Sequence, residues 1–222
     1  MLLSFVAGYV DTVGFVALFG LFTAHVTGNF VLIGASLVLA HKGGIIAKLA
    51  ALPVFVLAVA ATTTFVGVCK RDGKPPLSGV LFGQMVFLGG FAAVGIAASP
   101  VTNPDEPLAI LAGLLGVGAM GIQNTASRLL MSDLPPTTVM TGGVTQFSID
   151  AMRFLRGDTT SDAAESRRRL VTLAVPVAAF AMGAIAGALI YTGAGFLALL
   201  VPILVLMTVL ALTRTQSGAH SP

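Results

Sequence analysis

Long apolar stretches dominate this sequence and limit what it can fold into. A helix needs about 20 apolar residues to cross a bilayer. Six stretches meet that length, at 1–20, 46–68, 79–98, 108–127, 170–190 and 193–212. Only 9% of the 222 residues are charged, whereas soluble domains carry about 25%, so lipid must surround most of the chain. The sequence predicts an all-α integral membrane protein with about six transmembrane helices.

The remaining composition excludes several other classes. The first stretch lacks a basic start and a small-residue cleavage site and contains Asp11, so we expect a mature helix rather than a signal peptide. The single Cys69 allows no intramolecular disulfide and no metal cluster, and we expect neither a metal nor a cofactor. The net charge of +3 comes from basic residues at helix ends, a topology signal that does not indicate nucleic-acid binding.

Charges in the connecting segments predict the topology. Residues 69–76 and 153–169 are basic, whereas 99–107 lacks Lys and Arg and carries two acidic residues. The positive-inside rule places the two basic segments in the cytoplasm and 99–107 outside. From 99–107 to the second basic segment the chain must cross the membrane an odd number of times. The stretch 108–127 supplies one crossing, so 133–155 should enter from the cytoplasm and return as a re-entrant element. The same reasoning makes 21–40 re-entrant from the outside, with both termini cytoplasmic.

Three landmarks recur in the same order in the two halves of the chain. They pair Gly8-Tyr-Val-Asp11 with Gly121-Ile-Gln-Asn124, Thr27-Gly-Asn29 with Thr141-Gly-Gly143, and Pro53 with Pro176. With three spans in each half, the second copy would be inverted in the membrane, as in many secondary transporters. We therefore divide the single membrane domain into a first repeat at 1–98, a second repeat at 108–212 and a disordered C-terminal tail at 213–222. The alternative is chance similarity between two apolar, glycine-rich stretches.

Both re-entrant elements combine β-branched residues with glycines. Such residues favour extended backbone, so we expect extended chain reaching the midplane and then a half-helix starting near Thr27 or Thr141. The first N–H groups of a helix lack partners within it, and two such starts facing each other would bind an anion or a polar solute. Alternatively, the threonines only cap the helices and the glycines only pack. The candidate substrate-binding residues are Thr27, Gly28, Asn29, Thr141, Gly142, Gly143 and Gln146.

Polar side chains within the apolar stretches are candidates for a solute or ion pathway. Asp11 lies in the middle of the first stretch, where a carboxylate is costly unless polar neighbours bond it or it serves a function. His25 precedes the half-helix and is the residue type that titrates near neutral pH, although a lone histidine is more often structural. Gln123 and Asn124 are adjacent amides in one helix, and Asn124 is the repeat partner of Asp11. Asp150 is expected to pair with a nearby arginine.

Two motifs resemble known families. The stretch Ala7-Gly-Tyr-Val-Asp-Thr-Val-Gly-Phe15, followed by His25-Val-Thr-Gly-Asn29, resembles the YoaK-type family of uncharacterised bacterial membrane proteins. That resemblance implies a bacterial inner-membrane location and about six helices, but no activity. Thr141-Gly-Gly-Val-Thr-Gln146 looks like an element of sulfate-permease-type anion transporters, in which the anion binds between two half-helix starts. This likeness implies that Thr27 to Asn29 and Thr141 to Gly143 line a substrate site, although the chain is much shorter than those transporters.

These observations favour a small secondary transporter or channel for an anion or small polar solute, and not an enzyme. A non-catalytic assembly or sensor protein is the first alternative. An intramembrane enzyme using Asp11 with Asp150 is less expected, because no G-x-G-D or G-x-S-G element is present. Gly183 and Gly187 form a G-x-x-x-G that permits close helix contact, either within one chain or in a homodimer. The expected partners are the lipid bilayer, the solute and, in the homodimer alternative, a second copy of the chain.

Overall fold

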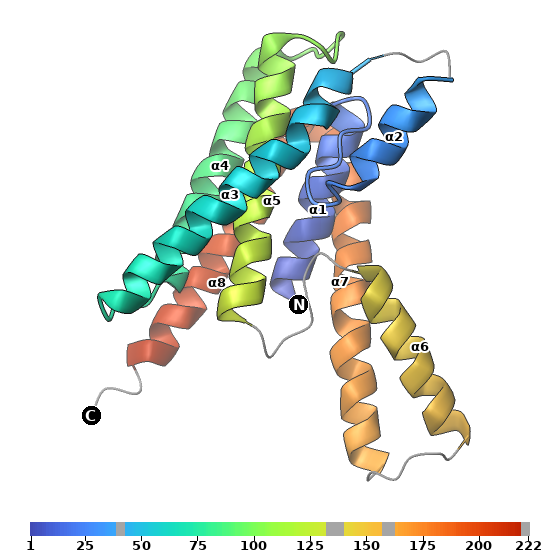
Figure 1. Cartoon of the computed structure of the whole chain (residues 1–222), viewed down its shortest axis with the longest axis vertical. Helices are drawn as coiled ribbons and strands as arrows, with labels where there is room; N and C mark the ends of the chain where they lie inside the picture. The colour runs from blue at the N-terminus through green and yellow to red at the C-terminus, as the bar shows by residue number, and fades with distance from the viewer. Residues whose placement is uncertain (39–42, 132–139, 157–162, 219–222) are drawn as a thin grey trace.

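Helices make up the regular structure of the described residues, 1–38, 43–131, 140–156 and 163–218, in a computed structural model of the chain (Figure 1). In chain order they are α1 (Leu2–Ala17), α2 (Gly28–Ser36), α3 (Ile45–Arg71), α4 (Leu77–Ala98), α5 (Pro107–Leu130), α6 (Met140–Arg156), α7 (Ala163–Ala194), the 3-10 helix η1 (Gly195–Leu199) and α8 (Leu200–Gly218). The prediction of an all-α protein is therefore confirmed for this part of the chain.

Four apolar stretches are long enough to cross a membrane. They are α3, α4, α5 and the stretch Leu170–Thr213, within which α7 gives way to α8. Helix α1 is apolar but shorter, at 16 residues. A multi-pass membrane protein is thus confirmed. Helix α8 continues to Gly218, so helical structure extends into the segment 213–222 that the sequence predicted to be a disordered tail.

Glycine and proline set several helix boundaries. Gly195 adopts left-handed backbone at φ 56° and marks the junction between α7 and η1. Gly44, at φ 68°, immediately precedes α3. Pro107 occupies the first position of α5, where the N–H that proline lacks would have no partner within the helix.

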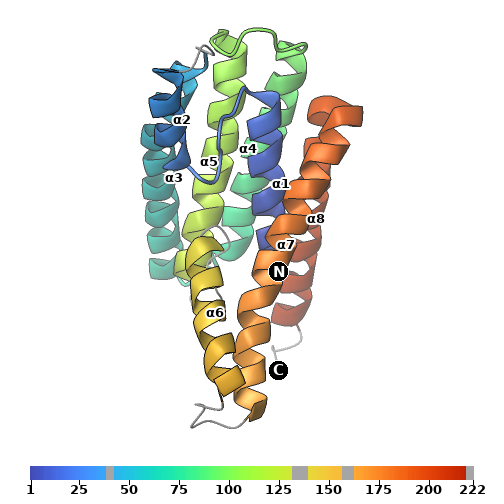
Figure 2. The same cartoon turned by 90° about the vertical axis from the view of Figure 1, so that its right-hand side faces the viewer.

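The helices run in both directions along the long axis of the molecule. In Figures 1 and 2, α1 and α2 run toward the end that carries the 99–106 loop, α3 runs away from it and α4 returns. Helices α5 and α6 then run away from that end, α7 returns and α8 runs away again. The start of α1, the α3–α4 turn and the last turn of α8 therefore lie toward the opposite end.

Helices α1 and α7 share the most extensive interface between two helices. Their backbones approach closely at Gly8 of α1 and at Gly183 and Gly187 of α7. A Cβ added to Gly8 would lie 2.1 Å from the carbonyl oxygen of Phe180, and one added to Gly183 would lie 2.1 Å from that of Phe5. The G-x-x-x-G motif therefore packs against α1 of the same chain, which is the first of the two uses that its sequence allowed.

The chain between α1 and α2, residues 18–27, is irregular. Helix α1 ends where Phe19 and Gly20 adopt left-handed backbone, at φ 53° and 81°, a conformation that is uncommon for a bulky residue such as phenylalanine. The chain then turns back beside α1 toward the middle of the bundle, and α2 begins at Gly28 (Figure 1). This start agrees with the half-helix that the sequence predicted near Thr27.

Glycines in the neighbouring helices make room for this irregular segment. A Cβ on Gly14 of α1 would lie 2.6 Å from the methyl group of Thr23, and one on Gly113 of α5 would lie 2.3 Å from the side chain of Leu21. Leu21 and Thr23 are almost fully buried as a result. Non-helical backbone at membrane depth persists only where protein covers it or water reaches it. Here side chains and backbone of α1 and α5 cover it.

Candidate functional site

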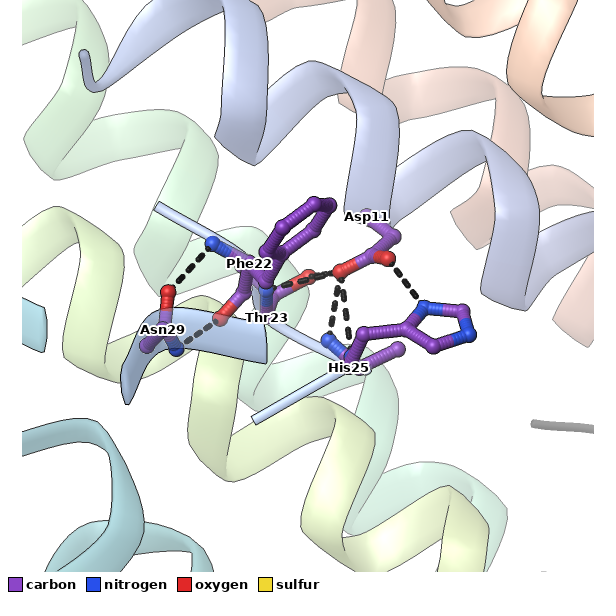
Figure 3. Close-up of polar contacts among 6 residues, drawn as sticks. Asp11, Phe22, Thr23, His25 and Asn29 are labelled. Atoms are coloured by element: carbon purple, nitrogen blue, oxygen red, sulfur yellow. Dashed lines mark hydrogen bonds and ion pairs between the residues drawn. The ribbon is translucent and has the colours of Figure 1, made fainter. Parts of the chain in front are cut away.

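Asp11 is the centre of a hydrogen-bond network that holds the irregular segment (Figure 3). Its Oδ1 accepts hydrogen bonds from the backbone N–H groups of Thr23 at 2.8 Å, Ala24 at 2.7 Å and His25 at 3.4 Å. The Thr23 hydroxyl donates to the same oxygen at 3.3 Å. The carboxylate is only 4% exposed. It supplies acceptors to backbone groups that have no helix partner, which explains how a carboxylate is accommodated in the middle of an apolar helix.

Two further side chains hold the irregular segment. Asn29 of α2 bonds the backbone of Phe22 twice, with Oδ1 accepting from its N–H and Nδ2 donating to its carbonyl oxygen, both at 2.9 Å (Figure 3). Nearer to α1, Nζ of Lys48 donates to the carbonyl oxygen of Phe19 at 2.9 Å. Both Asn29 and Lys48 are buried. The segment is therefore held by three polar side chains from three different helices, α1, α2 and α3.

His25 links this network to open space. Its Nδ1 lies 2.6 Å from Oδ2 of Asp11, so a single hydrogen lies between the two atoms. The imidazole ring packs at right angles to the ring of Phe180, with 5.5 Å between the ring centres. Its other nitrogen, Nε2, points away from Asp11 (Figure 3) and has no partner among the described residues. The side chain is 40% exposed, so this nitrogen is accessible.

An open pocket of about 610 Å³ lies beside His25, and we call it the His25 pocket. It is bounded by α1, the irregular segment, the start of α2, and α7. Its lining residues are Asp11, Thr12, Phe15, Phe22, His25, Thr27, Gly28 and Phe180. Four of the residues predicted from the sequence to line a site or pathway are thus brought together: Asp11, His25, Thr27 and Gly28.

The start of α2 differs from the predicted anion site. The N–H groups of Gly28, Asn29 and Phe30 donate to the carbonyl oxygens of residues 25–27 at 2.8 to 3.2 Å. These donors were expected to be free for a ligand, but the preceding turn already satisfies them. The side chain of Asn29, another predicted ligand, is committed to Phe22. The polar groups that this structure presents to the His25 pocket are therefore side chains, among them the imidazole, and not the helix terminus.

The two adjacent amides of α5 lie outside this pocket. Gln123 is fully buried; its Nε2 donates to the Leu3 carbonyl oxygen at 2.8 Å and its Oε1 accepts from Gln84 at 2.7 Å. These bonds tie α1, α4 and α5 together, which is a framework role. Asn124 is half-buried on the same helix and does not line the His25 pocket.

The second predicted element stands apart from the His25 pocket. Helix α6 begins at Met140, beside the predicted start at Thr141, whereas the extended chain predicted at 136–139 lies outside the described residues. Helix α6 packs along α7, and of the candidate residues on it, Gly142, Gly143 and Gln146 do not line the pocket, whereas the side chain of Thr141 lies outside the described part of the chain.

On the exposed side of α6, Nε2 of Gln146 donates to Oδ1 of Asp150 at 3.0 Å. Nη1 of Arg153 lies 4.0 Å from the same oxygen, so Asp150 has the arginine partner that was expected. Asp150 is therefore engaged within α6, and it does not line the pocket that contains Asp11.

Several site residues were not predicted from the sequence. Phe15 lies four residues after Asp11 on α1, a helical spacing that was a usable signal, whereas Thr12 directly follows Asp11 and has no such spacing. Phe180 carries no such signal, because it reaches the pocket only through the packing of α7 against α1. Lys48 was not among the candidates, and it is buried and donates to the carbonyl oxygen of Phe19.

Comparisons with known proteins place this architecture in a family. The chain is similar to UPF0700 transmembrane protein YoaK of Bacillus subtilis (strain 168), with 33% identity over 141 residues, which cover 64% of this chain and 60% of that protein. No solved structure matches. A family model described as "Protein of unknown function (DUF1275)" matches residues 1–212. This match over nearly the whole chain confirms the YoaK-type resemblance and shows that the protein belongs to the DUF1275 family.

Proposed function

We propose that this protein is a small secondary transporter or channel for an anion or small polar solute, which binds in the His25 pocket. The observation that carries the proposal is the pocket itself, where irregular backbone inside an apolar bundle presents an accessible imidazole. Ionisable groups within a membrane protein are costly and commonly mark a solute or proton pathway. A purely structural Asp11–His25 pair would not need an open volume of about 610 Å³ on its free side.

The proposal includes six crossings arranged as an inverted repeat in a bacterial inner membrane. The directions of α1 to α4 are each reversed in α5 to α8, as expected for an inverted copy (Figures 1 and 2). The aligned glycines also have matching roles. Gly8 of α1 lies against the Phe180 carbonyl of α7, and Gly121 of α5 lies against α3, where an added Cβ would be 3.2 Å from the Phe55 carbonyl oxygen. Pro53 and Pro176, which the repeat aligns, lie inside α3 and α7.

The second half supports the same arrangement. The start of α6 lies below the start of α2 in both views, and the two helices point in opposite directions (Figures 1 and 2). In an inverted repeat these helices are the two half-helices. Asp11 would then correspond to Asn124, whose matching backbone partners fall in the segment 132–139 outside the described residues.

Labelling from opposite sides tests the proposed topology. In a Cys69→Ser background, Thr102→Cys in the 99–106 loop should react with a membrane-impermeant maleimide applied outside intact cells. Gly73→Cys in the α3–α4 turn should react only after the membrane is opened. Both positions are exposed, so accessibility within the fold does not limit either reaction. Labelling of both from the same side would contradict six crossings with cytoplasmic termini.

Flux measurements test the transport proposal. Purified protein in proteoliposomes should take up at least one solute from a panel of inorganic anions, monocarboxylates, amino acids and nucleobases. Thr27→Phe places a ring in the His25 pocket, and we expect it to reduce the initial rate at least about tenfold, the effect of losing roughly 1.4 kcal/mol of binding. The matched control is Thr63→Phe, which adds the same ring to an exposed position of α3 and should leave the rate unchanged.

The assembly or sensor alternative makes the opposite prediction. It needs the Asp11 network for folding but no solute in the pocket. Folded, monodisperse protein that transports no member of the panel would favour this alternative. Equal initial uptake rates for Thr27→Phe and Thr63→Phe would show that the transported solute does not pass through the His25 pocket.

A further inference from the structure

The hydrogen bonds of Asp11 determine where the hydrogens of His25 lie. Three backbone N–H groups and one hydroxyl donate to Oδ1 of Asp11, and donors of this kind favour the charged carboxylate. The hydrogen between Oδ2 and Nδ1, which are 2.6 Å apart, therefore belongs to the imidazole. In a neutral imidazole the other nitrogen then has no hydrogen and acts as an acceptor. In the neutral form of the ring, Nε2 of His25 thus offers a lone pair to the His25 pocket, whereas in the imidazolium form it carries a hydrogen.

The rest of the lining is aromatic. Phe15, Phe22 and Phe180 border the pocket, and in the part of the chain that the structure describes its polar side chains besides His25 are Asp11, Thr12 and Thr27. The carboxylate is buried and committed to the irregular segment, so it does not offer a free charge. Among the described residues, no lysine or arginine lines the pocket to neutralise a full anionic charge, and Asp11 and His25 are the only titratable groups in the lining.

We infer that the His25 pocket takes a small planar solute with an N–H or O–H donor, such as an azole or an undissociated weak acid, whose donor bonds Nε2 of His25. The ring of the solute lies among the phenylalanines, where ring faces and edges pack favourably. This inference rests on the proposed function, because it narrows the solute of the same pocket. Of the anions and small polar solutes proposed above, it selects those that donate a hydrogen bond to the imidazole.

A matched pair of probes tests the inference in the full-length protein in lipid nanodiscs. Benzimidazole has a ring N–H, and 1-methylbenzimidazole has a methyl group in its place. Histidine ring nitrogens labelled with ¹⁵N report both the hydrogen position and binding, and the chain has only three histidines to assign. We expect hydrogen on Nδ1 and none on Nε2 in the free protein at pH 7.5. We expect benzimidazole to bind about tenfold more tightly than its methylated form, the value of one hydrogen bond.

Two variants keep the test independent of folding. His25→Asn retains an N–H toward Asp11, and its amide oxygen lies nearer the backbone than Nε2, so the preference for benzimidazole should fall. Asp11→Asn retains the oxygen that accepts from Thr23 and Ala24, but its amide donates to Nδ1 and moves the ring hydrogen to Nε2. The preference for benzimidazole should then be lost. NMR titration of each variant with the two probes measures this.

Three results would overturn the inference: hydrogen on Nε2 in the wild-type protein, equal affinity of the wild type for the two probes, or no binding of either. None of these measurements requires flux. Donor-dependent binding without transport of any solute would therefore leave the ligand class standing and remove the transport proposal. Transport without a preference for the N–H probe would leave the transport proposal standing and remove the ligand class.

Discussion

Gly183→Ala is expected to yield little folded protein and to lower the free energy of unfolding by about 3 kcal/mol, the upper part of the range for overpacked cores. The new methyl group would lie 2.1 Å from the backbone carbonyl oxygen of Phe5 in α1. A flexible side chain could move aside, but a helix backbone cannot do so without separating α1 from α7 along their interface. Close backbone contact at small residues is a main source of helix association in membranes, so the loss should propagate along both helices.

A control on the same helix isolates this contact. Gly193 of α7 has no atom within 4 Å of an added Cβ, so Gly193→Ala should be neutral or slightly stabilising, because alanine favours helix over glycine by about 1 kcal/mol. Thermal unfolding followed by circular dichroism in detergent, together with the yield of monodisperse protein, measures both variants. Equal melting temperatures for the two variants would contradict the close packing of α1 on α7.

Asp11→Ala is expected to cost about 3 kcal/mol or more, because each buried N–H left without an acceptor costs roughly 1–3 kcal/mol. Alanine removes the acceptor of the Thr23 and Ala24 N–H groups, both of which lie in buried residues. Water has little access to replace it where α1 and α5 cover the segment. We expect residues 18–27 to lose their conformation and the His25 pocket to disappear with them.

Asp11→Asn separates this hydrogen-bonding role from charge. The amide oxygen still accepts from the segment, so the variant should remain folded and melt within a few degrees of the wild type. Asp72→Ala is the control for loss of a carboxylate, since Asp72 is exposed in the α3–α4 turn and makes only 4.0 Å ion-pair contacts. If the Asp11→Ala and Asp72→Ala proteins melt at the same temperature, Asp11 does not hold the irregular segment.

Much of the architecture was predictable from local sequence. Apolar length predicted the helices, and the combination of threonines with Gly28 predicted the start of α2 to within one residue. These features depend on short-range preferences, namely apolar run length and the backbone freedom of glycine. The irregular segment between α1 and α2 was also expected, because β-branched residues followed by glycine interrupt an otherwise helical pattern.

The roles of the polar residues were harder to predict. Asp11 was a candidate for a solute or ion pathway, but its main partners in the structure are backbone N–H groups more than ten residues away. A sequence shows that a carboxylate is present and not which amides lie near it. The start of α2 was expected to offer free donors, and the tight turn at residues 25–27 satisfies them. Phe180 reaches the site only because glycines let α7 approach α1.

The central claim is that the start of α2 borders a pocket that lies within the bundle and is accessible to solutes dissolved in water. The most direct measurement is the rate at which a membrane-impermeant maleimide modifies Thr27→Cys in sealed vesicles in a Cys69→Ser background. We predict a rate below that of Thr102→Cys in the exposed loop but at least about tenfold above that of Thr63→Cys at an exposed position of α3, within a stretch long enough to cross a membrane. A Thr27→Cys protein as unreactive as Thr63→Cys would contradict the account, because the His25 pocket would then be closed to water.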